Sequence, residues 1–213
     1  MGDSENALDG VQGESLRRFL APLQALVRVL EHFENRGIII GGLAVGLLTE
    51  PRFTDDVDAM LILSLERADE FLEVAAKENL VSRIAQPLSF VRRAHVFLLE
   101  HVPTGIRVDV SLGMLPVEIE AVDRSNLVRL GELTIRLPTA EDLIIFKAVA
   151  HRPKDLIDIR AVIEHYPNLD VKRIRTWVND LGALLERPEL WTDIAGWLEP
   201  KSPPRPRRRR SRT

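Results

Sequence analysis

The sequence predicts a mixed α/β fold, and three observations point to it. Residues 38–40 are three consecutive isoleucines, and a β-branched run of this kind is typical of a buried strand. Residues 56–63 alternate between polar and apolar side chains and then become fully apolar, as a core strand does. From Pro138 to about Leu198 the pattern is helical. We therefore expect a sheet in the first part of the chain and a helical region after it.

The remaining elements follow from periodicity and from residues that end helices. Residues 15–36 place leucine and phenylalanine side chains on one face of a helix, and Gly37 is expected to end it. A short helix is expected at 43–48, directly after the isoleucine run. The other expected elements are helices at 65–79 and 116–123 and strands at 94–100, 106–112 and 133–137, the first two of these strands forming a hairpin.

Length and composition allow one substantial core and a smaller appended one, since 45% of the 213 residues are hydrophobic. The absence of cysteine excludes disulfides and zinc–thiolate sites, and a cytoplasmic location is expected. No apolar run has the length of a membrane span, so no membrane contact is expected. We expect four segments: a disordered N-terminus (1–14), an α/β domain (15–137), a helical C-terminal region (138–200) and a disordered arginine-rich tail (201–213).

A glycine pair, Gly41-Gly42, ends the isoleucine run. A strand that enters a helix through two glycines leaves backbone N–H groups uncovered at the positive start of the helix. The missing Cβ atoms allow an anion such as a phosphate to come close. A tight turn that needs positive φ is the alternative explanation of the pair.

Two carboxylates, Asp56 and Asp58, follow the glycine pair at a spacing of i, i+2. In a strand they share one face and lie about 6.6 Å apart along it. Carboxylates this close repel each other unless a cation lies between them, and hard oxygen ligands suit Mg²⁺ or Mn²⁺. A two-metal site of this kind supports in-line displacement at phosphorus. A solvated strand end is the alternative.

Asp109 offers a third carboxylate. It alternates with Val108 and Val110, so it lies on the polar face of its strand. If that strand is an antiparallel or mixed neighbour of the Asp56 strand, the three carboxylates form a cluster that can bind a metal and deprotonate an attacking hydroxyl. An ordinary exposed strand residue is the alternative.

Lys147 stands out because its expected helix is apolar on nearly all sides. Thr139 is a good N-cap for this helix, which runs from Ala140 to about Ala150 and is expected to be buried. A lysine on a buried surface needs a partner or a path to water. A phosphate in an active site would be such a partner.

These motifs resemble the signature of the nucleotidyltransferase superfamily that includes DNA polymerase β. Within it, the chain is most similar to AbiEii-type nucleotidyltransferases, which are toxins of toxin–antitoxin and phage-defence systems. The resemblance is carried by Gly-Gly-x-Ala at 41–44, by Arg-x-Thr-x-Asp-Val-Asp at 52–58, and by the block 138–158 with Lys147, Arg152, Lys154, Asp155 and Asp158.

The resemblance implies a nucleotidyltransferase domain at 15–137, preceded by an N-terminal helix and followed by a helical extension. It implies that Mg²⁺ or Mn²⁺ is held by three residues: Asp56, Asp58 and Asp109. It also implies that several residues surround the nucleotide: Gly41, Gly42, Arg52, Thr54, Lys147, Arg152, Lys154 and Asp155. Many superfamily members have Gly-Ser in place of Gly41-Gly42, which leaves the choice of nucleotide open.

The expected reaction is metal-dependent transfer of a nucleoside monophosphate from a nucleoside triphosphate to an acceptor hydroxyl, with release of pyrophosphate. By resemblance the acceptor is a tRNA 3′ end or another RNA, and a cognate antitoxin protein is a partner. Two alternatives stay open: a small-molecule transferase of the aminoglycoside type, and a non-catalytic nucleotide-binding or antitoxin-like module. Three clustered acids argue against the second, since they cost stability without a metal.

Charge is uneven along the chain. Residues 201–213 carry +7 and the whole chain carries −3, so residues 1–200 carry −10. An arginine-rich tail on an acidic body can anchor an RNA backbone, and it can equally pair with the protein's own acids.

Overall fold

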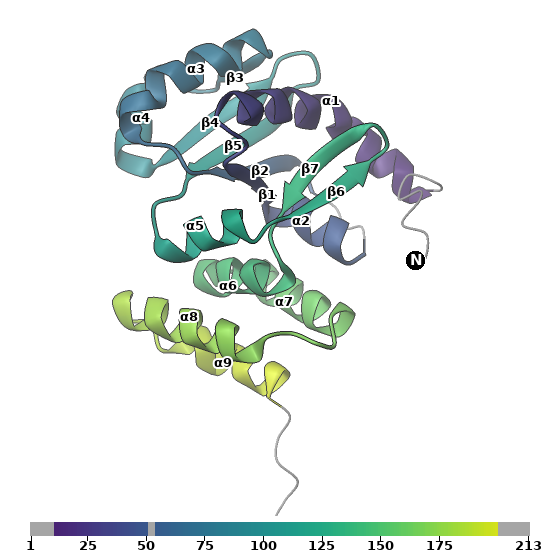
Figure 1. The fold of residues 1–213 in the computed structure, drawn as a ribbon, viewed down its shortest axis with the longest axis vertical. Helices are drawn as coiled ribbons and strands as arrows, with labels where there is room; N and C mark the ends of the chain where they lie inside the picture. Colours follow the sequence, from purple (N-terminus) through teal and green to yellow (C-terminus); the bar gives the residue numbers. More distant parts are fainter. Residues whose placement is uncertain (1–10, 51–53, 200–213) are drawn as a thin grey trace, which may run out of the picture.

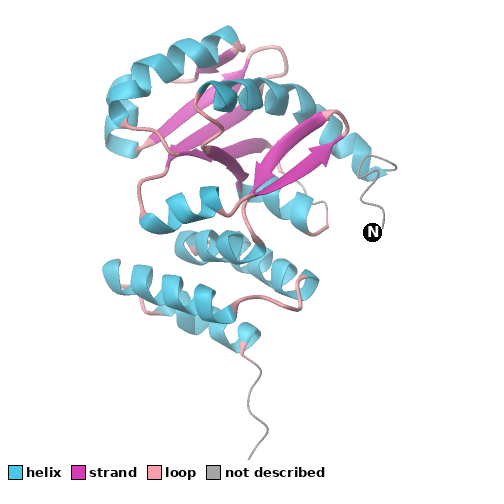
Figure 2. Cartoon of the chain, in the orientation of Figure 1, coloured by secondary structure: helices cyan, strands magenta, loops and turns pink. Residues whose placement is uncertain are grey.

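A computed structural model, which describes residues 11–50 and 54–199, confirms the mixed α/β fold. A five-stranded sheet has the strand order β1-β2-β5-β4-β3, and β6 and β7 form a separate two-stranded ribbon. Figures 1 and 2 show the sheet in the upper half of the molecule and the helical C-terminal region beneath it. The predictions for residues 1–10, for Arg52 and for the arginine-rich tail lie outside the described residues.

The strands of the main sheet run antiparallel except for one central pair. Strands β2 and β5 are parallel, whereas β1, β4 and β3 each pair antiparallel with their neighbours. The expected hairpin is the pair β4–β5. The strand bounds are β1 Gly37–Ile40, β2 Asp56–Leu61, β3 Leu80–Ser82, β4 Val96–His101, β5 Ile106–Leu112, β6 Asn126–Leu130 and β7 Leu133–Leu137.

Helices cover the sheet and build the region after β7. The helical pattern expected from Pro138 onward is confirmed as α6 to α9. The helix expected at 65–79 consists of a 3₁₀ turn, Leu65–Arg67, and α3. The helix bounds are α1 Val11–His32, α2 Gly41–Leu48, α3 Ala68–Lys77, α4 Pro87–Ala94, α5 Pro116–Asp123, α6 Ala140–Ala150, α7 Pro153–His165, α8 Val171–Leu184 and α9 Glu189–Leu198.

The first helix differs from its expected bounds at both ends. It begins at Val11 rather than at residue 15, and it ends at His32 rather than at Gly37. The chain turns through Glu34 and Asn35, which have φ values of 60° and 55°. Gly37 is instead the first residue of β1, where a Cβ atom would lie 2.6 Å from a methyl group of Leu30. Gly37 therefore permits close packing between β1 and α1 and does not end the helix.

Three elements were absent from the sequence prediction: β3, α4 and β6. Strand β3 has only three residues, which is too short to establish an alternating pattern. Helix α4 begins with a proline and buries only Val91 fully, so its apolar face is narrow. Strand β6 lies at the edge of its ribbon, and Leu127 on it is 64% exposed.

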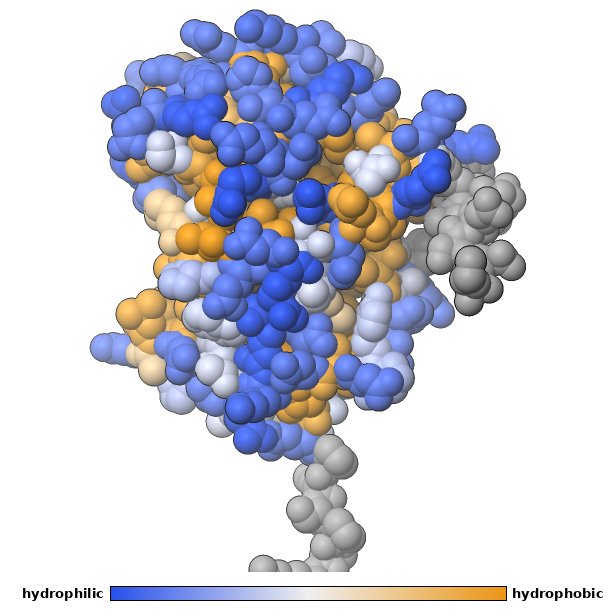
Figure 3. Space-filling view, viewed as in Figure 1, coloured by the Kyte–Doolittle hydropathy of each residue, from blue (hydrophilic) through white to orange (hydrophobic). Residues whose placement is uncertain are grey.

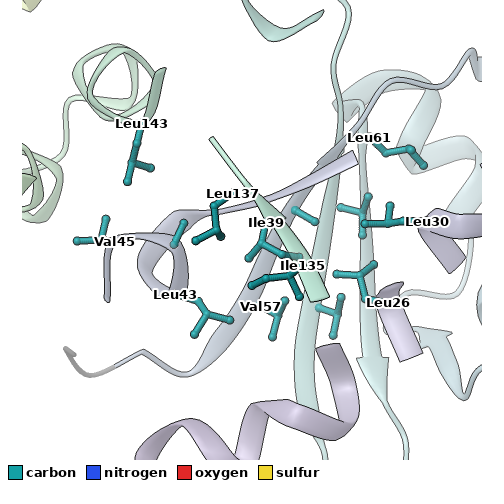
Figure 4. Packing of buried hydrophobic residues seen from close by; sticks show 14 of the residues in the cluster. Leu26, Leu30, Ile39, Leu43, Val45, Val57, Leu61, Ile135, Leu137 and Leu143 are labelled. Atoms are coloured by element: carbon teal, nitrogen blue, oxygen red, sulfur yellow. The ribbon is translucent and has the colours of Figure 1, made fainter. Parts of the chain in front are cut away.

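The main core lies on one face of the main sheet, and a smaller buried cluster, Ile38, Met60, Ala121 and Val122, packs on the other. Val57 and Leu61 of β2 are fully buried, and Leu26 and Leu30 of α1 pack over this face (Figure 4). Residues of β7 complete the same cluster, as Ile135 in Figure 4 shows. Because side chains alternate along a strand, the polar residues of β2 and β5 point to the opposite face.

The surface is mostly hydrophilic, and apolar side chains reach it near the middle of the molecule. On the face shown in Figure 3, they gather at the level of α5 and of the β6–β7 ribbon. The exposed large apolar residues include Met114 and Leu115, directly before α5, and Leu127 on β6. Among the described helices, none combines the length and apolar character needed to cross a membrane.

A buried charge network joins the helical region to the rest of the chain. Asp142 of α6 has no exposed surface and accepts hydrogen bonds from the Nε and Nη2 atoms of Arg173 at 3.0 and 2.7 Å. Arg173, on α8, also donates to Glu120 of α5 at 2.7 Å. Thr139 caps α6 as predicted, accepting a bond from the backbone N–H of Asp142. One arginine therefore connects α5, α6 and α8.

Replacing Arg173 by methionine leaves the buried Asp142 charge without its main partner. We expect Arg173→Met to lower the free energy of unfolding by about 3–5 kcal/mol, measured by urea unfolding followed by tryptophan fluorescence. Lys172→Met, an exposed change of the same charge on the same helix, should cost no more than about 0.5 kcal/mol. Equal losses in the two variants would contradict a stabilising role for the network.

Candidate active site

The three predicted carboxylates lie on the open face of the main sheet. Asp58 of β2 is directly opposite Asp109 of β5, and the first strand places Ile40 on the other side of Asp58. Asp56 lies two residues before Asp58, so it shares the same face. The prediction that Asp109 lies on a strand next to Asp58 is confirmed. Its physical cause is the burial of alternate valines and leucines on the opposite face.

The Asp58 carboxylate is buried and lies near two other carboxylates, and both effects change its pKa. Burial raises the pKa of the Asp58 carboxyl, and the charges of Asp56 and Asp109 raise it further. Lys147 and Lys154 act in the opposite direction and lower it. The neighbouring negative charges therefore add to the effect of burial on Asp58, and a bound cation would oppose both.

The donor chemistry fits a divalent cation, but the side chains are not arranged as a finished coordination sphere. Within residues 11–50 and 54–199, no group of three or more histidine, aspartate or glutamate side chains is placed to hold a metal ion. Instead, two arginine side chains lie next to the other two carboxylates, Asp109 and Asp56. Arg83 contacts Asp109, and the Arg107 Nη2 atom lies 3.7 Å from Asp56 Oδ2. Metal binding by the three acids stays a prediction.

Gly41 is where the site meets the start of α2. Its φ is +69°, as the tight-turn explanation requires, and a Cβ atom there would lie 1.9 Å from Asp58 Oδ2. The Asp58 carboxylate thus lies directly against the Gly41 backbone, in space that a side chain would fill. Gly42, the second residue of α2, is buried. Residue 41 is therefore a glycine for two reasons: the turn requires a positive φ, and the Asp58 carboxylate lies where a Cβ would be.

Thr54 supports Asp56 at the edge of the site. Its hydroxyl donates to Asp56 Oδ1 at 3.1 Å, and its backbone carbonyl contacts Arg18 of α1. The Thr54 hydroxyl therefore orients a carboxylate. The contact of Thr54 with a triphosphate stays a prediction. Arg52, predicted beside the triphosphate, lies outside the described residues.

Lys147 has its partners within the protein. Its Nζ atom lies 3.0 Å from Asp155 Oδ1 and 2.8 Å from Asp158 Oδ2, and all three residues are buried. The prediction that a buried lysine needs a partner is confirmed, but the immediate partners are carboxylates of α7. Contact with a phosphate stays a prediction for Lys147.

Asp155 holds two cations rather than presenting itself to a ligand. It has no exposed surface and accepts hydrogen bonds from Lys147 and from the Nε atom of Arg152 at 2.6 Å. Burial alone would raise the pKa of Asp155, but the hydrogen bonds from Arg152 and Lys147 outweigh it and hold the pKa below its usual value. Asp155 also caps α7 by accepting from the Arg152 backbone N–H at 3.1 Å. The predicted direct contact of Asp155 with a nucleotide does not fit its burial.

The end of α6 and the start of α7 thus bring positive charge to the carboxylates. The charge of Asp58 contributes to the raised pKa of Arg152, after the larger effect of the Asp155 hydrogen bond. Helix α2 contacts α6 and α7, and Figure 1 shows it between them and the sheet. The structure therefore brings the glycine pair, the three acids and the predicted cations Lys147, Arg152 and Lys154 to one place.

Two residues of this site were not singled out from the sequence: Arg83 and Arg107. Arg83 follows the three-residue strand β3, and no motif marks it. Arg107 precedes Asp109 by two residues, and that spacing alone could have placed it on the same face.

The chain belongs to the family described as nucleotidyltransferase of unknown function (DUF6036), whose model matches residues 16–187. It is therefore a nucleotidyltransferase, as the sequence motifs predicted. No curated protein sequence matches the chain.

One solved structure supports the fold. The chain is similar to an antigenic nucleotidyltransferase-like protein from Paracoccidioides brasiliensis, with 17% identity, a TM-score of 0.50, and coverage of 87% of this chain and 92% of that one. Antibiotic-resistance factor ANT(2'')-Ia gives 17% identity and a TM-score of 0.49, covering 78% and 95%. Lincosamide antibiotic adenylyltransferase LnuA gives 14% and 0.43, covering 67% and 97%. At 17% identity the likeness to the Paracoccidioides protein concerns the fold alone, and nothing is inferred from the other two structures.

Gly41→Ala tests the close approach of Asp58 to the helix start. Alanine at φ +69° is strained by about 1–2 kcal/mol, and its Cβ would also displace the Asp58 carboxylate. Gly105→Ala is the matched control, because its φ is +68° and nothing lies within 4 Å of its Cβ position. In thermal unfolding we expect Gly41→Ala to lose more stability than Gly105→Ala. Equal losses would show that only backbone strain matters.

The raised pKa of Asp58 predicts a pH-dependent effect of Asp58→Asn. Because the folded-state pKa lies above the unfolded value, the contribution of Asp58 is favourable below the unfolded pKa and is lost as pH rises through the folded pKa. Asp58→Asn removes that loss, so in EDTA-containing buffer the variant should be more stable than the parent at pH 8. The advantage should shrink toward pH 4.

Asp55→Asn is the control for this titration, since Asp55 is the exposed neighbour of the carboxylate pair. We expect no comparable pH-dependent gain from it in urea unfolding between pH 4 and 8. An Asp58→Asn advantage that grows as the pH falls would show that the sign is wrong.

Proposed function

We propose that the chain transfers a nucleoside monophosphate from a nucleoside triphosphate to an acceptor hydroxyl and releases pyrophosphate, using Mg²⁺ or Mn²⁺. One observation carries this proposal. Asp58, with a pKa raised by burial and by Asp56 and Asp109, lies against the Gly41 backbone at the start of a helix. A cluster of acids beside a phosphate-binding helix start is suited to a metal-bound nucleotide.

Each residue of the site has a role in this reaction. Asp56, Asp58 and Asp109 would hold the cation, which when bound neutralises phosphate charge and orients the reacting phosphate. Backbone N–H groups of Gly41 and Gly42 would bind phosphate oxygens. The acceptor oxygen forms a bond to the α-phosphorus, the bond from that phosphorus to the bridging oxygen breaks, and pyrophosphate leaves with the electron pair. The acceptor proton goes to Asp109.

The cations of α6 and α7 neutralise the charge that builds up on the leaving pyrophosphate. Lys154 and Arg152 are the more exposed of these, with 56% of the Arg152 side chain exposed. Lys147 adds its positive charge from a buried position, where Asp155 and Asp158 hold it. Fixed positive charge that faces developing negative charge lowers the barrier to transfer.

Two acceptor classes are supported by different features. The motif resemblance to AbiEii-type toxins supports an RNA acceptor, the tRNA 3′ end above all, together with a cognate antitoxin. The charge of −10 on residues 1–200 opposes a polyanion on the body of the protein and supports a cationic small molecule of the aminoglycoside class. The proposed donor, a nucleoside triphosphate, is a cytoplasmic metabolite, and we place the enzyme there.

Thermal unfolding with Mg²⁺ and each of ATP, GTP, CTP and UTP tests the metal and the donor. At a ligand concentration about 100 times its Kd we expect about 2.7 kcal/mol of stabilisation from at least one nucleotide, dependent on Mg²⁺. Asp58→Ala should abolish this stabilisation and Asp55→Ala should retain it. Absence of any Mg²⁺-dependent nucleotide effect would favour the non-catalytic module.

Incubation with each α-labelled nucleotide separates the acceptors. Total tRNA, cell protein and a panel of aminoglycosides are offered in parallel, and label transfer is followed with and without EDTA. Label on tRNA supports the toxin-like reaction, and label on an aminoglycoside supports the small-molecule reaction. Transfer that Asp109→Asn leaves intact would contradict the role given to Asp109.

A further inference from the structure

Arg83 is fixed to the sheet by its own backbone and side chain. Directly after β3, its backbone N–H donates to the Leu98 carbonyl at 2.9 Å, and its Nε atom donates to the Leu99 carbonyl at 3.0 Å. Both acceptors belong to β4. The guanidinium is thus held in one orientation before any ligand arrives.

The same guanidinium reaches the carboxylate cluster. Its Nη2 atom donates to Asp109 Oδ1, and both side chains are about three-quarters buried, with 26% and 27% of their surfaces exposed. Across the sheet, Leu98 lies opposite Asp109, and Asp109 lies opposite Asp58. The Arg83 side chain therefore reaches across β4 to Asp109 on β5, and Asp109 in turn lies beside Asp58 on β2.

This arrangement differs from an ordinary surface ion pair. A surface pair contributes little because two long side chains must be ordered to make it. Arg83 is already ordered by the Leu99 carbonyl, and its planar guanidinium can donate to Leu99 and to Asp109 together. Its positive charge also lies against Asp109, one of the two carboxylates whose charges raise the pKa of Asp58.

We propose that Arg83 is a positioning residue of the transfer site. Its guanidinium holds Asp109 beside Asp58 and supplies the positive charge that the three acids need, and a divalent cation competes with it for Asp109. This inference rests on the proposed function, since it assumes that the cluster binds a metal. Removing the guanidinium leaves the cluster more negative, so a cation should bind more tightly.

Mn²⁺ alone, titrated against the full-length protein with free Mn²⁺ measured by electron paramagnetic resonance, tests the competition. We expect Arg83→Gln to lower the Mn²⁺ dissociation constant by about threefold or more. Without Mn²⁺ the variant should unfold at a lower temperature than the parent, and saturating Mn²⁺ should reduce that difference. Arg129→Gln, the same charge change at an exposed position on β6, should leave the dissociation constant unchanged.

Arg83→Lys provides a second variant that keeps the charge but loses the planar fork. Its Mn²⁺ affinity should fall between those of the parent and Arg83→Gln, and it carries the test if Arg83→Gln does not fold. Unchanged or weaker Mn²⁺ binding in the Arg83 variants overturns the inference. Asp58→Ala distinguishes failure of this inference from failure of the proposed function. The proposed function predicts that Asp58→Ala binds Mn²⁺ more weakly than the parent, whatever the Arg83 variants do.

Discussion

The contact between the Asp58 carboxylate and the Gly41 backbone is the constraint on which the site depends. It forces a glycine at the start of α2, because a Cβ there would lie 1.9 Å from the carboxylate oxygen. It also buries Asp58 among other acids, which raises its pKa and makes the metal-free site unfavourable at neutral pH. A cation bound at this point would offset that cost, so the local cost in stability and the proposed metal binding have one origin.

The positive side of the site depends on buried acids further along the chain. Lys147 is held in place by Asp155 and Asp158, and α6, which carries it, is anchored through Asp142 to Arg173. Breaking such buried pairs costs several kcal/mol, because one charge is left uncompensated. The helical C-terminal region therefore does more than complete the core: it sets the position of the cations relative to the sheet.

Features with a local physical signal could be predicted from the sequence. The alternating pattern placed Asp58 and Asp109 on one face, because the valines that alternate with them along β2 and β5 are buried on the other. An apolar helix made Lys147 conspicuous, but its partners could not be predicted, since Asp155 and Asp158 reach it only through the packing of α7 on α6. Arg83 gave no signal at all, because its role arises from strand order and from a contact across β4. The end of α1 was misplaced because a left-handed turn at Glu34 and Asn35 replaced the expected glycine.

The central claim is that the carboxylates, the start of α2 and the cations of α6 and α7 form one site for a metal-bound nucleotide. A crystal structure with Mn²⁺ and a non-hydrolysable nucleoside triphosphate tests it most directly, with the metal located by anomalous scattering. We expect Mn²⁺ at Asp56, Asp58 and Asp109, and phosphates at Gly41-Gly42 facing Lys154. Mn²⁺ and nucleotide bound elsewhere, with Asp109 still held by Arg83 and the acids empty, would contradict it.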